Sequence, residues 1–158
     1  MENHPDHSEQ ARAYFMQGYN CSQSVAAAFA PEMGLTVQAA LRLAAGFGGG
    51  FGRMREVCGA FSGMVLVLGA LYGSTDPAQK TELYKAVQAL AARYKAGNGG
   101  GSLLCRELLG LPRAEGSPEA SARTAAYYQK RPCADLVALA AGEMEAYIAA
   151  HPLPTTAE

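Results

Sequence analysis

Basic side chains are scarce and scattered in this sequence of 158 residues. The formal net charge is −1, charged residues make up 17% of the chain, and the longest run of Lys or Arg is Lys130-Arg131. Proteins that bind nucleic acid or anionic membrane surfaces carry basic patches, because they neutralise several phosphates at once. The sequence therefore predicts no nucleic-acid partner and no attachment to a charged membrane surface.

The first ten residues contain neither the basic region nor the apolar region of a secretory signal. We therefore expect a cytoplasmic protein. In a reducing compartment, cysteines more often serve as catalytic thiols or metal ligands than as permanent disulfides. This gives the four cysteines of the chain a candidate chemical role: Cys21, Cys58, Cys105 and Cys133.

The sequence has no stretch of alternating apolar and polar residues, no internal repeat and no domain linker. Apolar residues recur instead at helical spacing, and capping residues precede most of these runs. We predict an all-α, single-domain bundle of six to eight helices over residues 1–158, with frayed tails at 1–7 and 151–158. The predicted helices cover residues 9–17, a segment starting at 21, 37–45, 57–72, 76–97, 103–109, 117–128 and 133–150.

The centre of the bundle is predicted to be the most apolar stretch, residues 57–72. No charge occurs from Val57 to Thr75, and these 19 residues approach the length of a membrane-spanning helix. The stretch also contains four glycines and three serines or threonines, and it lacks aromatic residues at both ends. A buried core helix is therefore favoured over a membrane span.

A glycine-rich loop, residues 46–52, leads into this helix. It does not match a dinucleotide fingerprint, because Phe51 stands where the third glycine would be, and the Gly-Lys-Ser/Thr of a phosphate-binding loop is absent. We predict a close-packed turn that forms a wall of a thiol site. The candidate cofactor-binding residues are Gly48, Gly49, Gly50, Gly59 and Arg53.

The apolar helix itself has one face with almost no side chain. Gly59 and Gly63 lie four residues apart, which puts them on the same side of the helix. Another backbone or a bulky ligand is expected to approach closely there.

Each cysteine falls in the first turn of a predicted helix. Four helix N-termini would bring partial positive charge to stabilise thiolates or a thiolate-ligated metal cluster, so we predict that the sulfurs gather in one pocket within roughly 10 Å. Cys58 is expected to be the most acidic and reactive thiol, because the glycine loop exposes it. Nearby arginines would add to the positive field: Arg53, Arg55, Arg106 and Arg131.

The chain resembles a known family through the motif Cys58-Gly59-Ala60-Phe61-Ser62-Gly63. This hexapeptide is similar to the Cys-Gly-Ala-x-x-Gly motif of the C_GCAxxG_C_C family of small redox-active proteins. The family label places one cysteine before the motif and two after it, as Cys21, Cys105 and Cys133 stand here. The resemblance covers nearly the whole chain and implies a redox role for all four cysteines and a functional link to a transporter. It names no substrate.

Two classes of function remain open. In the first, the clustered cysteines carry out thiol/disulfide exchange or electron transfer, with one thiolate attacking and a second cysteine resolving the intermediate. In the second, all four cysteines bind an iron–sulfur cluster or another metal without turnover. Their spacings of 37, 47 and 28 residues include no paired-ligand knuckle of the zinc type.

The partner expected for either class is a redox partner or a small molecule, and a homo-oligomer is compatible with the sequence. The three histidines lie near the ends of the chain and provide no evident base for a protease-like Cys–His pair. Acyl-transfer chemistry is therefore not expected.

Overall fold

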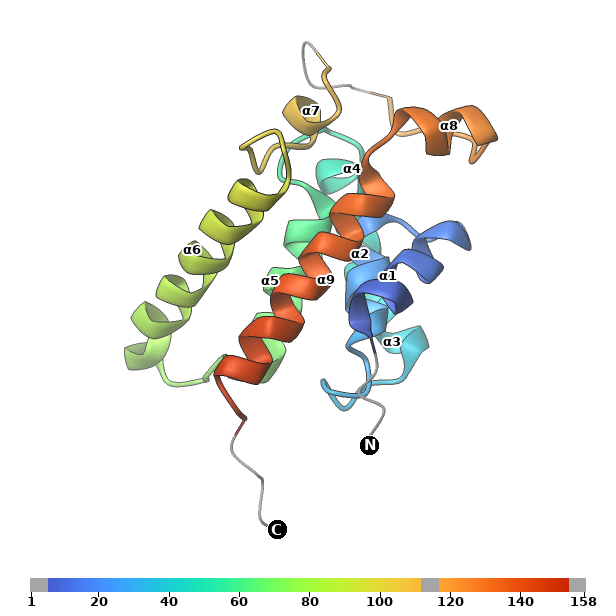
Figure 1. Cartoon of the computed structure of the whole chain (residues 1–158). Helices are drawn as coiled ribbons and strands as arrows, with labels where there is room; N and C mark the ends of the chain where they lie inside the picture. Colours follow the sequence, from blue (N-terminus) through green and yellow to red (C-terminus); the bar gives the residue numbers. More distant parts are fainter. Residues whose placement is uncertain (1–5, 112–116, 154–158) are drawn as a thin grey trace.

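The computed structural model describes residues 6–111 and 117–153, and helices form all of the regular structure there except one isolated bridge between Val57 and Leu104 (Figure 1). The all-α prediction is confirmed. The longer helices are α1 (His7–Met16), α2 (Cys21–Ala28), α3 (Val37–Ala44), α5 (Gly59–Tyr72), α6 (Lys80–Gly97) and α9 (Cys133–Ala150). The short segments are η1 (Ala45–Phe47), α4 (Gly48–Phe51), η2 (Pro77–Gln79), α7 (Cys105–Leu108) and α8 (Ala125–Lys130).

The segment α4 is a glycine turn rather than a helix. Gly49 and Gly50 have φ values of 69° and 70°, in the left-handed region that glycine adopts without steric cost. Setting α4 aside leaves eight α-helices in the described residues, within the predicted range of six to eight.

Helix α5 lies at the centre, as predicted. It packs against α2, α6 and α9, while α1 packs against α2 and α9, and α3 packs against α2 (Figure 1). The expectation that the helices beginning near residues 76 and 133 would pack against α5 is therefore confirmed. No helix in the part of the chain that the structure describes is long and apolar enough to cross a membrane.

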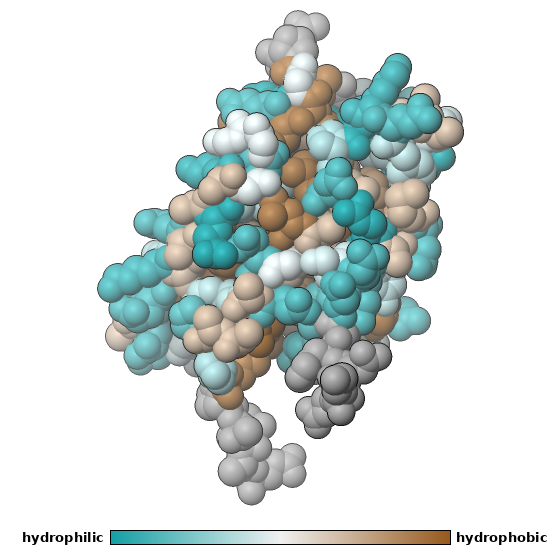
Figure 2. Space-filling view, viewed as in Figure 1, coloured by the Kyte–Doolittle hydropathy of each residue, from teal (hydrophilic) through white to brown (hydrophobic). Residues whose placement is uncertain are grey.

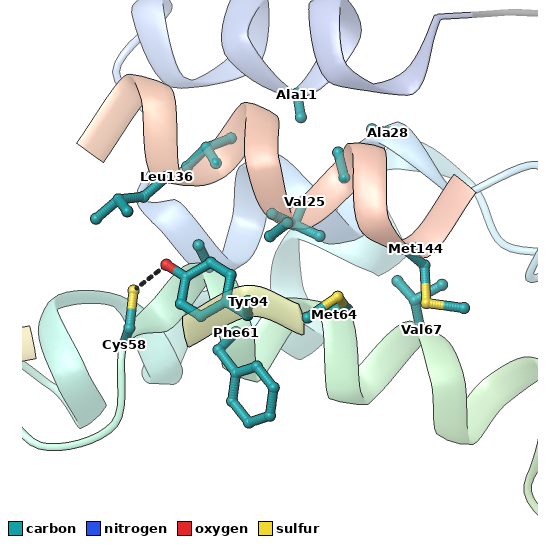
Figure 3. Packing of buried hydrophobic residues seen from close by; sticks show 14 of the residues in the cluster. Ala11, Val25, Ala28, Cys58, Phe61, Met64, Val67, Tyr94, Leu136 and Met144 are labelled. Atoms are coloured by element: carbon teal, nitrogen blue, oxygen red, sulfur yellow. Dashed lines mark hydrogen bonds between the residues drawn. The ribbon is translucent and has the colours of Figure 1, made fainter. Parts of the chain in front are cut away.

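The core is formed by apolar side chains of α5 and of four other helices, α1, α2, α6 and α9. Met64 of α5 is completely buried together with Val25 of α2 and Met144 of α9 (Figure 3). Leu68 of α5 and Leu90 of α6 are completely buried as well. Each such side chain stabilises the fold by about 1.5–3 kcal/mol relative to leaving it in water. On the face shown in Figure 2, hydrophobic atoms form a seam between hydrophilic side chains on both sides.

The first helix begins earlier than predicted. Asp6 is its N-cap and accepts a hydrogen bond from the amide of Glu9, so α1 starts at His7. Ser8, the predicted cap, instead donates its hydroxyl hydrogen to the carbonyl of Ala138 in α9. Residues 6 and 7 are thus not frayed. Of the tails predicted to fray, 1–5 and 154–158 lie outside the described residues.

Three other helices begin later than predicted. Val57 and Leu104 form an isolated antiparallel bridge, and the amide of Cys58 donates to the carbonyl of Leu103. Because this pairing occupies the predicted helix starts, α5 begins at Gly59 and α7 at Cys105. The helix predicted from residue 117 begins only at Ala125, where Thr124 is the N-cap. Residues 112–116 lie outside the described part of the chain.

Candidate functional site

The four cysteines line one cavity of about 60 Å³ at the end of the bundle where α2, α5, α7 and α9 begin (Figure 1). The predicted gathering of the sulfurs in one pocket is confirmed. Three of the cysteines are buried, and Cys21 is partly exposed. A space of this size holds a few water molecules or the end of a small molecule.

Helix starts position three of the four thiols as predicted. Cys21 follows the N-cap Asn20, whose side chain and Gln23 form a capping box that fixes the start of α2. Cys105 and Cys133 are likewise the first residues of α7 and α9. Cys58 is different, because it is the N-cap of α5 and lies just outside the helix.

Cys21 and Cys133 form a hydrogen-bonded pair in the cavity. The bond from the Cys21 thiol lowers the pKa of Cys133 to about 7, although burial opposes the change, and the nearby charges of Arg131, Arg123 and Arg55 act in the same direction as the bond. The pKa of Cys21 is raised, first by its bond to Cys133 and then by burial. The charges of the three arginines favour ionisation of Cys133, so Cys133 is the thiol of the pair that loses its proton more readily.

Cys58 contacts Tyr94, which was not among the predicted site residues. Its sulfur lies 3.1 Å from the hydroxyl oxygen of Tyr94, a completely buried side chain of α6 (Figure 3). Burial raises the pKa of Cys58, and the Tyr94 hydroxyl and the amides of Phe61 and Ala60 only partly oppose it. The prediction that Cys58 is exposed and the most acidic thiol is therefore wrong, because the side chain is 4% exposed.

Cys105 faces a buried arginine. Nη1 of Arg55 donates to the Cys105 sulfur across 3.7 Å. Burial raises the pKa of Cys105, whereas the Arg55 hydrogen bond and charge oppose the rise. The backbone of Arg55 is in the left-handed region, with φ of 62°. A hydrogen bond from its backbone amide to the carbonyl of Gly49 holds it in this conformation. Such a conformation costs a non-glycine residue about 1–3 kcal/mol, so the loop holds this arginine against local strain.

Of the four arginines expected to strengthen the positive field, two act on the thiols. Arg55 and Arg131 favour the thiolate forms of Cys105 and Cys133. Arg106 pairs instead with Glu56, 3.0 Å away.

Arg53 has hydrogen-bond partners in the segment that precedes α8. Its guanidinium donates to the carbonyl of Ser117 and the hydroxyl of Ser121. The candidate cofactor-binding role of Arg53 thus finds no support in a contact to the sulfurs.

The glycine loop forms a wall of the thiol cavity, through close backbone packing. Gly49 lines the cavity directly, as does Gly59. A Cβ atom on Gly48 would lie 2.2 Å from the Asn20 side chain, and one on Gly50 would lie 2.8 Å from the Cβ of Cys105. Side chains at these positions would therefore displace the segments that carry Cys21 and Cys105.

The donor set does not fit a metal ion or cluster bound by all four cysteines. No group of three or more Cys, His, Asp or Glu residues within 6–111 and 117–153 is arranged to hold a metal ion. The sulfurs have different partners: Cys58 contacts Tyr94, Cys105 contacts Arg55, and Cys21 interacts with Cys133. The geometry thus supports pairs of thiols rather than one set of four ligands.

Tyr94 and Arg123 belong to the site but were not predicted from the sequence. Tyr94 sits in a helical apolar pattern that gives no sign of its hydroxyl contact. Arg123 lines the thiol cavity from a segment predicted to be helical, and its guanidinium lies 4.2 Å from the centre of the Phe15 ring. A run of aromatic residues near an arginine could have suggested such stacking, but the long-range partner Phe15 could not be read from spacing.

A family model matches most of the length of this chain. The model described as "Putative redox-active protein (C_GCAxxG_C_C)" matches residues 19–147, a range that includes all four cysteines. No curated protein and no solved structure matches the chain. The resemblance carried by the motif at Cys58 is confirmed, and the chain belongs to the C_GCAxxG_C_C family of redox-active proteins.

Proposed function

We propose that this protein carries out thiol–disulfide exchange, with Cys133 as the attacking thiolate and Cys21 as the resolving cysteine. The proposal is carried by the shared cavity, which is lined by Cys21, Cys133 and two arginines, Arg55 and Arg123. The interaction with Cys21 and the nearby arginine charges lower the pKa of Cys133 to about 7. A thiol with a pKa near the ambient pH combines a substantial thiolate fraction with good nucleophilicity. The other three thiols have raised pKa values and are poorer attacking groups.

The reaction has two exchange steps. The Cys133 thiolate attacks one sulfur of a substrate disulfide, forms a mixed disulfide and releases the other half as a thiolate, which takes up a proton. Cys21 then loses its proton and attacks the Cys133 sulfur, which releases the second half as a thiol. The substrate disulfide is reduced to two thiols, and the protein dithiol is oxidised to a Cys21–Cys133 disulfide.

The surrounding residues assist these steps by position and charge. Arg55, Arg123 and Arg131 favour the Cys133 thiolate before attack. The bond from Cys21 places the resolving sulfur beside the attacking one, so the second step needs little movement. Cys58 and Cys105, each held by a separate partner, take no part in this first exchange.

The alternative of electron transfer through a bound metal or iron–sulfur cluster is less well supported, because the described side chains include no three-ligand group. Thiol exchange also suits the cytoplasm, where we expect this protein to act and where reductants can return the Cys21–Cys133 disulfide to the dithiol.

A trapping experiment tests the assignment of roles. Fully reduced wild-type protein is mixed with neutral bis(2-hydroxyethyl) disulfide, and the products are identified by mass spectrometry of the intact chain and its peptides. We expect wild-type protein to lose two hydrogen atoms and yield linked Cys21 and Cys133 peptides. Cys21→Ser should accumulate the mixed disulfide on Cys133, and Cys133→Ser should form neither product.

The matched control is Cys58→Ser, which leaves the proposed pair intact and should react at the wild-type rate. Mixed disulfide on Cys58 or Cys105 in the Cys21→Ser variant would contradict the assignment of Cys133 as nucleophile. Chelatable metal found in protein purified without oxygen, with no reaction toward the disulfide, would favour the metal-binding alternative.

A further inference from the structure

A second, larger cleft borders the thiol cavity. It has a volume of about 560 Å³, which lies in the range of small-molecule binding sites, whereas the thiol cavity is far too small for a whole ligand. The residues that line both spaces are Asn20, Gly49, Arg55, Arg123 and Tyr127. A molecule in the cleft can therefore place one end against the cysteines.

The cleft is lined by positive charge. Its arginines are Arg53, Arg55, Arg123 and Arg131, and we call this space the arginine cleft. Among the described residues that line it, none is Asp or Glu. The glycine loop contributes backbone at Gly48, Gly49 and Gly52, and neutral hydrogen-bonding groups are present at Asn20, Gln23, Ser121 and Tyr127.

Within the described part of the chain, neither Arg123 nor Arg131 forms an ion pair with a carboxylate. Arg123 donates to the backbone carbonyls of Phe15 and Tyr19, and its guanidinium stacks on aromatic rings. Arg131 lies 5.3 Å from the centre of the Tyr127 ring. Carbonyl and ring contacts orient a guanidinium but leave its full charge available to an anion.

Both arginines also act on the Cys133 sulfur, so the charge and the nucleophile are close together. Each lowers the pKa of Cys133. An anionic group held between Arg123 and Arg131 would thus bring a neighbouring disulfide bond to Cys133. An anion this close would be attracted more strongly in the walled cleft than at an open surface, because fewer water molecules screen it.

We infer that the arginine cleft binds the oxyanion end of a small, negatively charged disulfide, and that this selects the substrate of Cys133. The inference rests on the proposed thiol–disulfide exchange and adds the substrate class. Attack on such a disulfide yields two anionic thiols and the Cys21–Cys133 disulfide, so atoms and electrons balance as in the general reaction.

Three small disulfides that differ in charge test the inference. Second-order rate constants are measured for reduced protein with anionic 3,3′-dithiodipropionate, neutral bis(2-hydroxyethyl) disulfide and cationic cystamine. Each value is divided by that of the same disulfide with free 2-mercaptoethanol, which removes intrinsic reactivity. We expect a preference for the anion over the neutral compound of about tenfold or more at low salt, and a smaller preference as salt rises.

The variant Arg131→Gln should lower this preference by about threefold to tenfold, because one of the charges next to Cys133 is lost. The ratio of two substrates within one variant is unaffected by any change in the Cys133 pKa. The matched control is Arg93→Gln, since Arg93 lies on α6, pairs with Glu143 and lines neither space. It should keep the wild-type ratio.

Suberate, a dicarboxylate with no disulfide bond, separates binding from exchange. It should slow the reaction with the neutral disulfide in wild-type protein and have a weaker effect in Arg131→Gln. Equal normalised rates for all three disulfides, with no effect of suberate, would overturn the anionic substrate class and leave thiol exchange standing. If no disulfide reacts, the proposed function fails, and calorimetry with suberate alone decides whether the arginine cleft binds dicarboxylates.

A sulfonate-bearing disulfide, the oxidised form of 2-mercaptoethanesulfonate, distinguishes carboxylate from sulfonate recognition. Comparable normalised rates for the two anions would support recognition of negative charge in general. A rate for the sulfonate no higher than that for the neutral compound would support recognition of carboxylate. Either result supports the arginine cleft, whereas cystamine reacting fastest would overturn it.

Discussion

Identical residues differ in chemistry here because their neighbours differ. Cys133 and Cys58 both stand at the beginning of a helix and both are buried. A hydrogen bond from Cys21 and the charges of three arginines lower the pKa of Cys133. Burial raises the pKa of Cys58, and only a tyrosine hydroxyl and two backbone amides oppose that rise. At the scale of the residue, partner charge decides which thiol ionises first.

The alkylation of Cys133 should therefore follow a lower pH midpoint than that of any other cysteine. The pKa of Cys133 is lowered to about 7, so its thiolate is half formed there, is lost as pH falls below 7 and is complete above 8 or so. Reaction with iodoacetamide across a pH series, read by peptide mass spectrometry, should show this. In Cys21→Ala, which lacks the donated bond, the midpoint should rise. A Cys133 midpoint at or above that of Cys58 would contradict the assignment.

The hydroxyl of Tyr94 should matter for both stability and Cys58. Tyr94→Phe keeps the buried ring and removes one buried hydrogen bond, which should lower the free energy of unfolding by about 1 kcal/mol. It should also slow alkylation of Cys58, because the hydroxyl favours the thiolate. Tyr84→Phe on the exposed face of the same helix is the control and should change neither quantity. Faster alkylation of Cys58 in Tyr94→Phe would show that the hydroxyl blocks access instead.

At the scale of the element, the bare face of α5 allows α2 to approach closely, as the spacing of Gly59 and Gly63 predicted. A Cβ atom on Gly63 would lie 2.8 Å from the carbonyl oxygen of Ser22, and one on Gly59 would lie 3.2 Å from the Cβ of Cys21. The contact between these helices also sets the position of Cys21 at the start of α2. Helix packing and the geometry of the thiol pair are therefore linked.

Two alanine substitutions in α5 separate packing from helix propensity. Gly63→Ala should lower the free energy of unfolding by about 1–3 kcal/mol, because the new methyl group meets backbone that cannot move aside locally. Gly69→Ala should raise it by about 0.5–1 kcal/mol, since a Cβ atom there meets nothing within 4 Å. Chemical denaturation of both variants measures the difference. Equal effects of the two substitutions would contradict the close contact between α2 and α5.

Much of the helical architecture could be predicted because it depends on local chemistry. Asn20 and Thr36 cap the helices that follow them, and the glycine loop ends before α5. The starts of α5 and α7 could not be predicted, because the pairing of Val57 with Leu104 overrides local preference. The gathering of the cysteines followed from their shared place at helix starts, whereas the order of their acidity depended on Tyr94 and Arg123.

At the scale of the whole molecule, His7 links three distant segments. Its ring nitrogens lie 2.7 Å from a carboxylate oxygen of Glu145 in α9 and 2.6 Å from one of Glu32 after α2, and its ring stacks on Phe29. Each ring nitrogen therefore has a carboxylate oxygen within hydrogen-bond distance, so one side chain of α1 contacts both of the other segments. The histidines near the chain ends, set aside as catalytic bases, thus include one structural residue.

Replacing His7 by Leu should lower the free energy of unfolding by about 1–3 kcal/mol, because two carboxylates lose their shared hydrogen-bond partner. Urea denaturation at neutral pH measures the change. The control is His151→Leu, at an exposed position beyond α9. Addition of Glu32→Gln and Glu145→Gln to His7→Leu should recover part of the loss, and an undiminished loss would show that ring packing on Phe29 dominates.

The two thiols of the proposed pair stand near opposite ends of the sequence, at the first residues of α2 and α9. A bond between them would close most of the polypeptide into a ring, and a ring has far fewer unfolded shapes than an open chain. Oxidation should thus make the folded protein more stable by about 4–5 kcal/mol, the value expected for a closed loop of roughly 100 residues. The melting temperature of the oxidised form should exceed that of the reduced form, and Cys21→Ser should abolish the difference. The melting temperature of a sample would then report whether its Cys21–Cys133 pair is oxidised or reduced.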